Sequence, residues 1–383
     1  MRRLAWLGLL VLLVACTGTQ SVQAPILLFV THSEGGVHRA ALVEDAQFSD
    51  PRFTYLQDTE TVLAGAPVDF DVVDRAGSRS QIVLLLETGA NDYQAAWFTT
   101  DGIVADTAAE LAEARAATDL TGSLAGVLSD PADLCLTHIQ TTHDGELLAL
   151  LNEPGAGNCA SSVASPSVFL VAADGEFIRE LATSQSLLPS GLYIRQATGD
   201  QEDFLFVLDE GVGAARLNEL ELPDGALDAG TEFASGSDIP VPLDFGYTNG
   251  NFVVIQPDYL YVHGQARVSL SPSSGNNRLI ADPYGDQLPA LLVLRTGSSG
   301  QLHVAVAGAA TETVTNLGNV SSGTVEPVQQ WAYLLTTTGI TTVDLMEIIE
   351  QFGNANPVSR ATIPEIGAPG LITWFQGLLP EVP

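Results

Sequence analysis

The stretch Ile82-Val83-Leu84-Leu85-Leu86 is an unbroken run of strand-forming apolar residues, with turn-forming residues a few positions away on both sides. A run of this length and composition predicts a β-strand that is buried on both faces. Six further runs have the same character, and successive runs start 39 to 65 residues apart. They are Ile26–Val30, Leu147–Leu151, Phe204–Leu208, Phe252–Ile255, Leu291–Leu294 and Tyr333–Leu335.

Most of these runs sit between two other strand-like segments. A less regular strand precedes them, as Val68–Val73 precedes Ile82, and a strand with a turn follows them, as Tyr93–Thr99 is followed by Asp101-Gly102. The repeating unit is therefore three or four antiparallel strands. The shorter spacings match a four-stranded propeller blade, and the longer ones indicate loop insertions.

The two ends of the chain break this pattern in complementary ways. The first unit begins with its apolar run and lacks a preceding strand, while the last unit is followed by a spare strand, Leu371–Phe375. A C-terminal strand that completes the first unit would close a ring and remove two exposed sheet edges. We predict an all-β fold with a single β-propeller over residues 25–383, built of seven four-stranded blades and closed by the C-terminal strand. Six or eight blades, or two β-sandwich domains, are the alternatives.

Two segments have helical character. Thr107–Ala117 is rich in Ala and Glu and predicts a helical insertion on the second unit. From Asp344 to Gly353, an N-cap residue precedes Leu345, Ile348, Ile349 and Phe352, which share one helical face. We expect that face to pack on the edge of a blade.

The first sixteen residues predict a targeting signal. Two arginines precede an apolar stretch that is too short for a membrane span, and the stretch ends in Leu13-Val14-Ala15-Cys16. This ending resembles the lipobox of bacterial lipoprotein signal peptides, which implies that residues 1–15 are removed and that Cys16 carries the lipid, with residues 16–24 as a tether. An ordinary secretory signal is the alternative. Thr17 after the cysteine favours the outer membrane.

The charge balance excludes some partners. The chain carries 46 Asp and Glu against 14 basic residues, all of them Arg, for a net charge of −32. Nucleic acid is excluded as a partner, because phosphate binding depends on Lys and Arg.

Two cysteines remain after the lipobox, Cys135 and Cys159. In an oxidising compartment an even pair predicts a disulfide, here between the strand near Leu134–Ile139 and the loop 155–165. Two free thiols or a metal pair are the alternatives.

The last unit carries a second resemblance. Gly339-Ile340-Thr341-Thr342-Val343-Asp344, followed by Asn356-Pro357-Val358, resembles the repeat of bacterial LVIVD-type propellers, although the segment between the two halves departs from that pattern. In overall plan the chain is also similar to the lipoprotein propeller of the outer-membrane β-barrel assembly machinery. That family's repeated blade tryptophan is absent here, since the chain beyond the signal has Trp97, Trp331 and Trp374. The resemblance implies an architecture and does not extend to barrel assembly.

No motif of a known catalytic class is present, and the absence of lysine excludes a phosphate-binding loop. Side chains with weak potential for a metal site are His138, His143, Asp282 and Asp286. Three acidic clusters are candidate glycosidase acids or calcium ligands, although solvated turns are the favoured interpretation. The clusters are Asp69, Asp71 and Asp74; Asp200, Glu202 and Asp203; and Asp282 with Asp286.

These observations predict a non-enzymatic, lipid-anchored protein of the bacterial cell envelope. We expect a protein–protein scaffold or accessory subunit of an outer-membrane or surface-layer complex, whose propeller face or rim binds envelope proteins while the lipid on Cys16 binds the membrane. No cofactor is expected except Ca²⁺. The alternative is a glycan-acting enzyme or a Ca²⁺-dependent ligand-binding propeller that uses acidic residues of the central channel.

Overall fold

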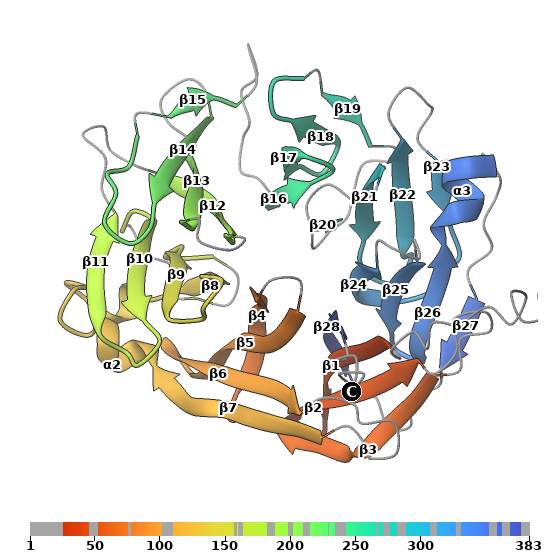
Figure 1. Ribbon diagram of the computed structural model, residues 1–383, viewed down its shortest axis with the longest axis horizontal. Helices are drawn as coiled ribbons and strands as arrows, with labels where there is room; N and C mark the ends of the chain where they lie inside the picture. The colour runs from red at the N-terminus through yellow and green to blue at the C-terminus, as the bar shows by residue number, and fades with distance from the viewer. Residues whose placement is uncertain are drawn as a thin grey trace, which may run out of the picture.

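A computed structural model shows seven four-stranded antiparallel sheets that follow one another around a ring (Figure 1). The prediction of a seven-bladed β-propeller is confirmed. The structure describes residues 26–45, 53–75, 78–101, 110–156, 159, 164–181, 188–197, 202–209, 215–228, 230–233, 243–265, 267–270, 276–281, 289–306, 312–326, 331–351, 358–361 and 368–376.

Each blade runs from an inner strand to an outer strand. Blade 1 is β28 (Ala368–Gln376), β1 (Ile26–Glu34), β2 (Val37–Asp45) and β3 (Phe53–Val62). Blade 2 is β4 (Ala66–Arg75), β5 (Ser78–Gly89), β6 (Asp92–Asp101) and β7 (Glu110–Asp119). Blade 3 is β8 (Leu136–Thr141), β9 (Leu147–Asn152), β10 (Ser167–Ala172) and β11 (Phe177–Leu181). Blade 4 is β12 (Pro189–Arg195), β13 (Phe204–Asp209), β14 (Arg216–Glu221) and β15 (Thr231–Glu232).

The remaining three blades repeat the same order. Blade 5 is β16 (Asp244–Thr248), β17 (Asn251–Ile255), β18 (Tyr259–Val262) and β19 (Val268–Ser269). Blade 6 is β20 (Asn277–Ile280), β21 (Ala290–Arg295), β22 (Gln301–Val306) and β23 (Glu312–Val314). Blade 7 is β24 (Val320–Glu326), β25 (Trp331–Thr336), β26 (Gly339–Asp344) and β27 (Val358–Ala361).

The seven apolar runs of the sequence are the second strands of the seven blades. Every residue of β9 and β21 is buried. The reason is that a second strand has a strand on each side in its own sheet and a neighbouring blade on each face. Alternate side chains therefore enter two different cores. In blade 2, Val83 and Leu85 pack toward blade 3, whereas Ile82 and Leu84 pack toward blade 1.

The C-terminal strand closes the ring. β28 pairs with β1 in antiparallel register, with Gln376 opposite Ile26 and Ile372 opposite Val30. The Leu371 N–H also donates to Thr31 Oγ1 at 2.8 Å. Blade 1 therefore combines three strands from one end of the chain with one strand from the other, as the unmatched strands of the sequence predict.

Of the two predicted helices, one is confirmed and one is wrong. Helix α3 (Leu345–Gln351) begins after Asp344, whose Oδ1 accepts from Met346 N–H at 2.9 Å, and buries Leu345 and Ile348 against blades 6 and 7. Residues 110–117 of the second predicted helix instead belong to β7, the outer strand of blade 2, and residues 107–109 lie outside the described part. Pairing with β6 and the stacking of Arg115 over the Trp97 ring at 4.6 Å override the helical propensity.

Short elements connect blades 2 and 3. They are helix α2 (Leu120–Leu124) and the 3₁₀ turn η1 (Pro131–Asp133). Among the described residues, no helix has the length and apolar character needed to cross a membrane.

Candidate functional site

The first strand of each blade lies on the inside of the ring (Figure 1). These seven strands are β4, β8, β12, β16, β20, β24 and β28, and each contacts the next around the ring. One edge of such a strand has no partner in its own sheet, so its backbone N–H groups need other acceptors. Side chains of the neighbouring blade supply several of them.

Asp69 and Asp71 of the predicted acidic clusters serve this purpose between blades 2 and 3, and the interpretation as solvated turns is wrong for them because both lie within β4. Asp69 Oδ2 accepts from Ile139 N–H at 3.0 Å, and Asp71 Oδ2 accepts from Thr141 N–H at 2.7 Å. The second oxygen of Asp71 accepts from Val72 N–H at 2.8 Å. Each carboxylate therefore joins its own strand to the inner strand of the next blade. We call this arrangement an aspartate clasp.

A third clasp joins blades 5 and 6, and its aspartate was not among the acidic residues singled out in the sequence. Asp244 Oδ1 accepts from Phe245 N–H at 2.9 Å and its Oδ2 from Leu279 N–H at 2.8 Å. A signal for it was present in the sequence, because Pro67-Val68-Asp69-Phe70 and Pro242-Leu243-Asp244-Phe245 share the pattern Pro-x-Asp-Phe.

At other junctions, uncharged side chains accept a hydrogen bond from a backbone N–H group of the neighbouring inner strand. Between blades 3 and 4, Gln140 Oε1 accepts from Ile194 N–H at 3.1 Å. Between blades 7 and 1, Ser322 Oγ accepts from Ile372 N–H at 3.3 Å. The clasp is thus a general way to join neighbouring inner strands, and a carboxylate is one version of it.

Asp69 lies deep in the ring, although part of its surface remains accessible. Burial raises the pKa of Asp69 above its ordinary value, and the charge of Asp244 acts in the same direction. His138 and the N–H groups of Ile139 and Phe70 oppose the shift without cancelling it.

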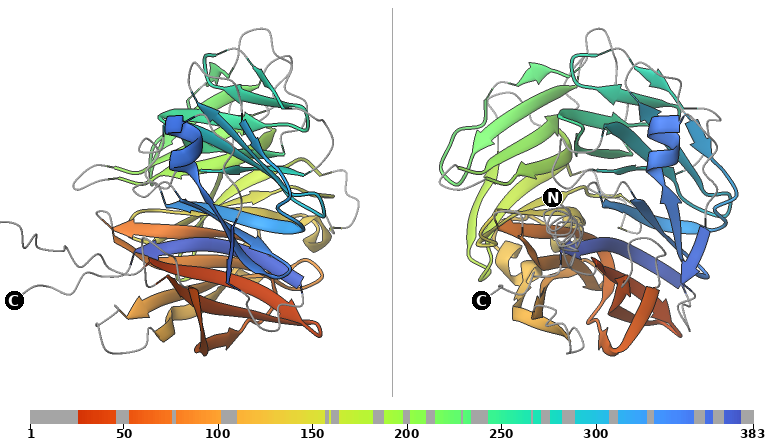
Figure 2. Two further views of the ribbon diagram at one scale, coloured as in Figure 1. Left: turned by 90° about the vertical axis from the view of Figure 1, so that its right-hand side faces the viewer. Right: turned by 45° about the vertical axis from the view of Figure 1, so that its right-hand side comes forward.

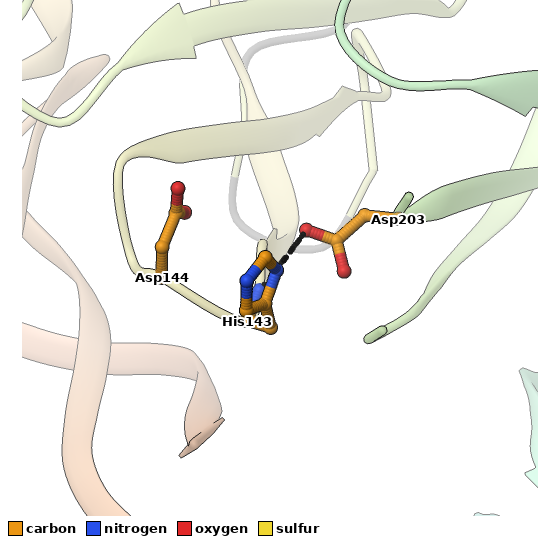
Figure 3. Close-up of side chains that lie close together, drawn as sticks. All are labelled: His143, Asp144 and Asp203. Atoms are coloured by element: carbon orange, nitrogen blue, oxygen red, sulfur yellow. Dashed lines mark hydrogen bonds and ion pairs between the residues drawn. The ribbon is translucent and has the colours of Figure 1, made fainter. Parts of the chain in front are cut away.

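A second group of ionisable side chains joins the turns of blades 3 and 4. His143 and Asp144 lie in the turn between β8 and β9, and Asp203 precedes β13. Their potential ligand atoms lie within 4.8 Å of one another. In Figure 3, Asp203 contacts the His143 ring from one side and Asp144 stands on the other.

Hydrogen bonds already engage both carboxylates of this group. Asp203 Oδ2 accepts from His143 Nδ1 at 2.9 Å and from His143 N–H at 3.2 Å, while its Oδ1 accepts from Ala197 N–H at 2.6 Å. Asp144 Oδ1 accepts from Thr142 Oγ1 at 2.6 Å and from Glu146 N–H at 3.0 Å. Asp203 is therefore another link between blades. Any cation held here would share these side chains with the hydrogen bonds that they already make.

The pKa of Asp144 reflects these contacts. Burial opposes its ionisation, but the hydrogen bonds from Thr142 and Glu146, together with the nearby His143, outweigh that effect and hold the pKa of Asp144 below its ordinary value.

The other predicted metal ligands do not join this group in the described part of the chain. The ring of His138 contacts Thr137 Oγ1 at 3.0 Å through Nδ1, which also lies 3.8 Å from a Glu153 carboxylate oxygen. Asp282 and Asp286 lie outside the described residues, as do Asp200 and Cys16. Asp74 lies near the end of β4.

The predicted disulfide is present. Cys135 and Cys159 are bonded, with their Cα atoms 5.9 Å apart. The bond joins the start of blade 3 to the loop after β9. Asn152 Oδ1 accepts from Cys135 N–H at 2.6 Å, and Asn91 of blade 2 donates through Nδ2 to Leu134 O at 2.5 Å.

Comparison with known proteins identifies the fold and no family. No protein-family model matches the sequence, and no curated protein matches it either. A functionally unknown protein from Desulfotomaculum acetoxidans DSM 771 has a similar structure, with a TM-score of 0.53 at 11% identity over 91% of this chain and 99% of that one. Apo AztD from Citrobacter koseri gives a TM-score of 0.43 at 11% identity over 90% of this chain and 84% of that one. At such identities the likeness concerns the fold alone.

Proposed function

We propose that this chain is a lipid-anchored propeller of the bacterial cell envelope that binds other envelope proteins and catalyses no reaction. The compartment is supported by the Cys135–Cys159 bond, because structural disulfides persist in oxidising compartments and are rare in the cytosol. The lipobox-like ending at Cys16 supports the anchor, since a multiply acylated cysteine holds a protein durably on a membrane.

The non-enzymatic role rests on one observation, the use of the inner-ring carboxylates as clasps. An acid or base that acts on a substrate must reach that substrate with a free oxygen. Asp71 and Asp244 each place one oxygen on their own strand and the other on the next blade, and Asp203 also uses both. These carboxylates hold the ring together, which favours a scaffold over a hydrolase that works in the channel.

The net charge of the chain indicates the charge of the surface that its partner presents. With 46 acidic and 14 basic residues, the propeller presents a strongly negative surface. Complementary charge speeds association and suppresses wrong partners. We therefore expect an envelope protein with a basic docking surface.

The test is affinity purification from detergent-solubilised envelopes, followed by mass spectrometry. We expect the wild-type chain to float with outer-membrane fractions and to recover a stoichiometric partner. The matched control is Cys16→Ser, which removes the lipid acceptor and leaves the propeller unchanged, so it should leave the membrane fraction. Recovery of a lone monomer would contradict the scaffold role, and hydrolysis of envelope glycans by the purified chain would contradict the non-enzymatic role.

One observation favours the alternative of a Ca²⁺-dependent ligand-binding propeller, namely the convergence of His143, Asp144 and Asp203. Calorimetry with Ca²⁺ and Zn²⁺ tests it. Binding heat in the wild type that disappears in His143→Ala would support the cation, whereas no heat and no rise in melting temperature would remove it.

A further inference from the structure

The two ends of the propeller leave the same corner of blade 1. β1 begins at Ile26 and β28 ends at Gln376, and these two residues are register partners. In the other blades the same position is occupied by the turn between the first and second strands. The chain that leads to Cys16 therefore enters the propeller where such a turn would lie.

All such turns lie on one face of the ring, because the inner strands run parallel to one another. Asp69 binds the N–H group of Ile139 and Asp71 binds that of Thr141, so residue numbers increase in the same direction along β4 and β8. The same holds between blades 7 and 1, where Ser321 Oγ donates to Gly370 O and Ser322 Oγ accepts from Ile372 N–H. Figure 2 (left) shows the strands running between the two faces.

We define the terminal face by the chain ends, the turn at His143 and Asp144, and the third-to-fourth-strand turns at Glu176 and Gln265. The distal face is opposite and carries the second-to-third-strand turns at Val37 and Thr337, together with the Cys135–Cys159 bond.

Chain length limits how the ring can lie on a membrane. Ten residue steps separate Cys16 from Ile26, and a fully extended chain of that length reaches at most about 36 Å. The nine residues of β1 span about 27 Å. Passing outward over β2 and β3 adds about 10 Å before side chains and loops are counted. The tether is therefore too short to pass around the rim and let the distal face rest on the bilayer.

We propose that the terminal face lies against the bilayer that holds Cys16, and that the distal face is presented to protein partners. This inference rests on the proposed lipidation of Cys16. It assigns the bilayer surface as the neighbour of the His143 turn. The disulfide-linked loops of blade 3 then belong to the partner-accessible side.

The absence of lysine provides a direct test. A single introduced lysine is the sole lysine ε-amine of the chain and takes an amine-reactive fluorophore. Glu176→Lys places it on the terminal face and Thr337→Lys on the distal face, and both positions are exposed. Gln265→Lys and Val37→Lys form a second pair, in case one variant of the first pair fails to fold. The wild-type chain, treated identically, measures labelling of the α-amine.

The labelled proteins are purified from membranes, reconstituted in phosphatidylglycerol–phosphatidylethanolamine vesicles with nitroxide-headgroup lipid, and floated. We expect several-fold stronger quenching at Glu176→Lys than at Thr337→Lys, and the same order in the second pair. Equal or reversed quenching on floated protein would overturn the orientation while leaving the anchor intact. Failure of the wild type to float with vesicles would overturn the anchor of the proposed function and the orientation with it.

Discussion

Neighbouring blades are held together by different interactions at two junctions, the one between blades 2 and 3 and the one between blades 4 and 5. At the first, two aspartate clasps and a disulfide on the blade 3 side supplement a mixed core in which aliphatic side chains pack with Tyr93, Trp97 and Phe169. At the second, aromatic rings surround Phe252. Its ring centroid lies 4.5 Å from Phe206, 4.9 Å from Tyr247, 5.8 Å from Phe245 and 6.0 Å from Tyr193.

A glycine makes the aromatic junction fit. A Cβ on Gly191 of β12 would lie 2.8 Å from Phe245 Cβ on β16, so glycine allows the two inner strands to approach. The inner strands of neighbouring blades must lie close together at a propeller junction. Hydrogen bonds from backbone N–H groups hold them together at one junction, and packed aromatic rings do so at the other. Substitutions at the two junctions separate these solutions, and the aromatic junction should show the largest effect.

Phe252→Ala should have the largest effect, because it removes the ring that contacts four others. We expect the free energy of unfolding to fall by about 4 kcal/mol. Urea unfolding followed by tryptophan fluorescence measures the change. Phe252→Leu, which keeps most of the volume, should lose much less, and equal losses in the two variants would contradict the role of the ring contacts.

Removal of the disulfide by Cys135→Ser with Cys159→Ser should come next. A loop of 24 residues predicts a loss of about 3.5 kcal/mol on the loop-entropy model. Differential scanning calorimetry measures it. The wild type under reducing conditions should match the double variant, and unchanged melting in both would show that the bond adds nothing to blade 3.

Asp71→Ala should cost about 2 kcal/mol, because it leaves the N–H groups of Thr141 and Val72 without the carboxylate that binds them. Asp71→Asn keeps one acceptor oxygen and should lose about half as much. The matched control is Asp58→Ala, on the exposed side of β3, which should change stability by less than about 0.5 kcal/mol. Equal effects at the two positions would refute the clasp.

The smallest effect is a pH dependence at the clasped junction. Burial raises the pKa of Asp69, so the folded state favours its protonated form. Its contribution to stability is therefore present below the ordinary Asp pKa and is lost as pH rises through the folded value. The unfolding free energy of the wild type minus that of Asp69→Asn should fall as the pH rises above the ordinary Asp pKa.

Asp144 should give the opposite sign, because its pKa is lowered in the fold. Its stabilisation is present above the ordinary Asp pKa and is lost as pH falls through the folded value. The wild type minus Asp144→Asn should therefore rise with pH, while the difference for Phe252→Ala stays flat. Parallel pH profiles for the two aspartates would contradict these assignments.

The sequence by itself predicted a ring of seven blades closed by the C-terminal strand, with six or eight blades as alternatives, and it predicted the disulfide, with two free thiols or a metal pair as alternatives. The seven apolar runs can be recognised in the sequence because the second strand of each blade is buried on both faces, which requires continuous apolar residues. The closure follows from two unmatched strands at opposite ends of the chain. Helix α3 is likewise local, since Asp344 caps it within two residues.

Tertiary structure alone decided the roles of the polar residues. Asp69 and Asp71 lie 70 residues from the N–H groups that they bind, and no periodicity reveals such a pairing. Tertiary contacts also turned residues 110–117 into a strand, because pairing with β6 and the contact of Arg115 with the Trp97 ring outweigh the helical preference of Ala and Glu. A burial pattern can be read from the order of residues along the chain, whereas hydrogen bonds between blades form only in the assembled ring.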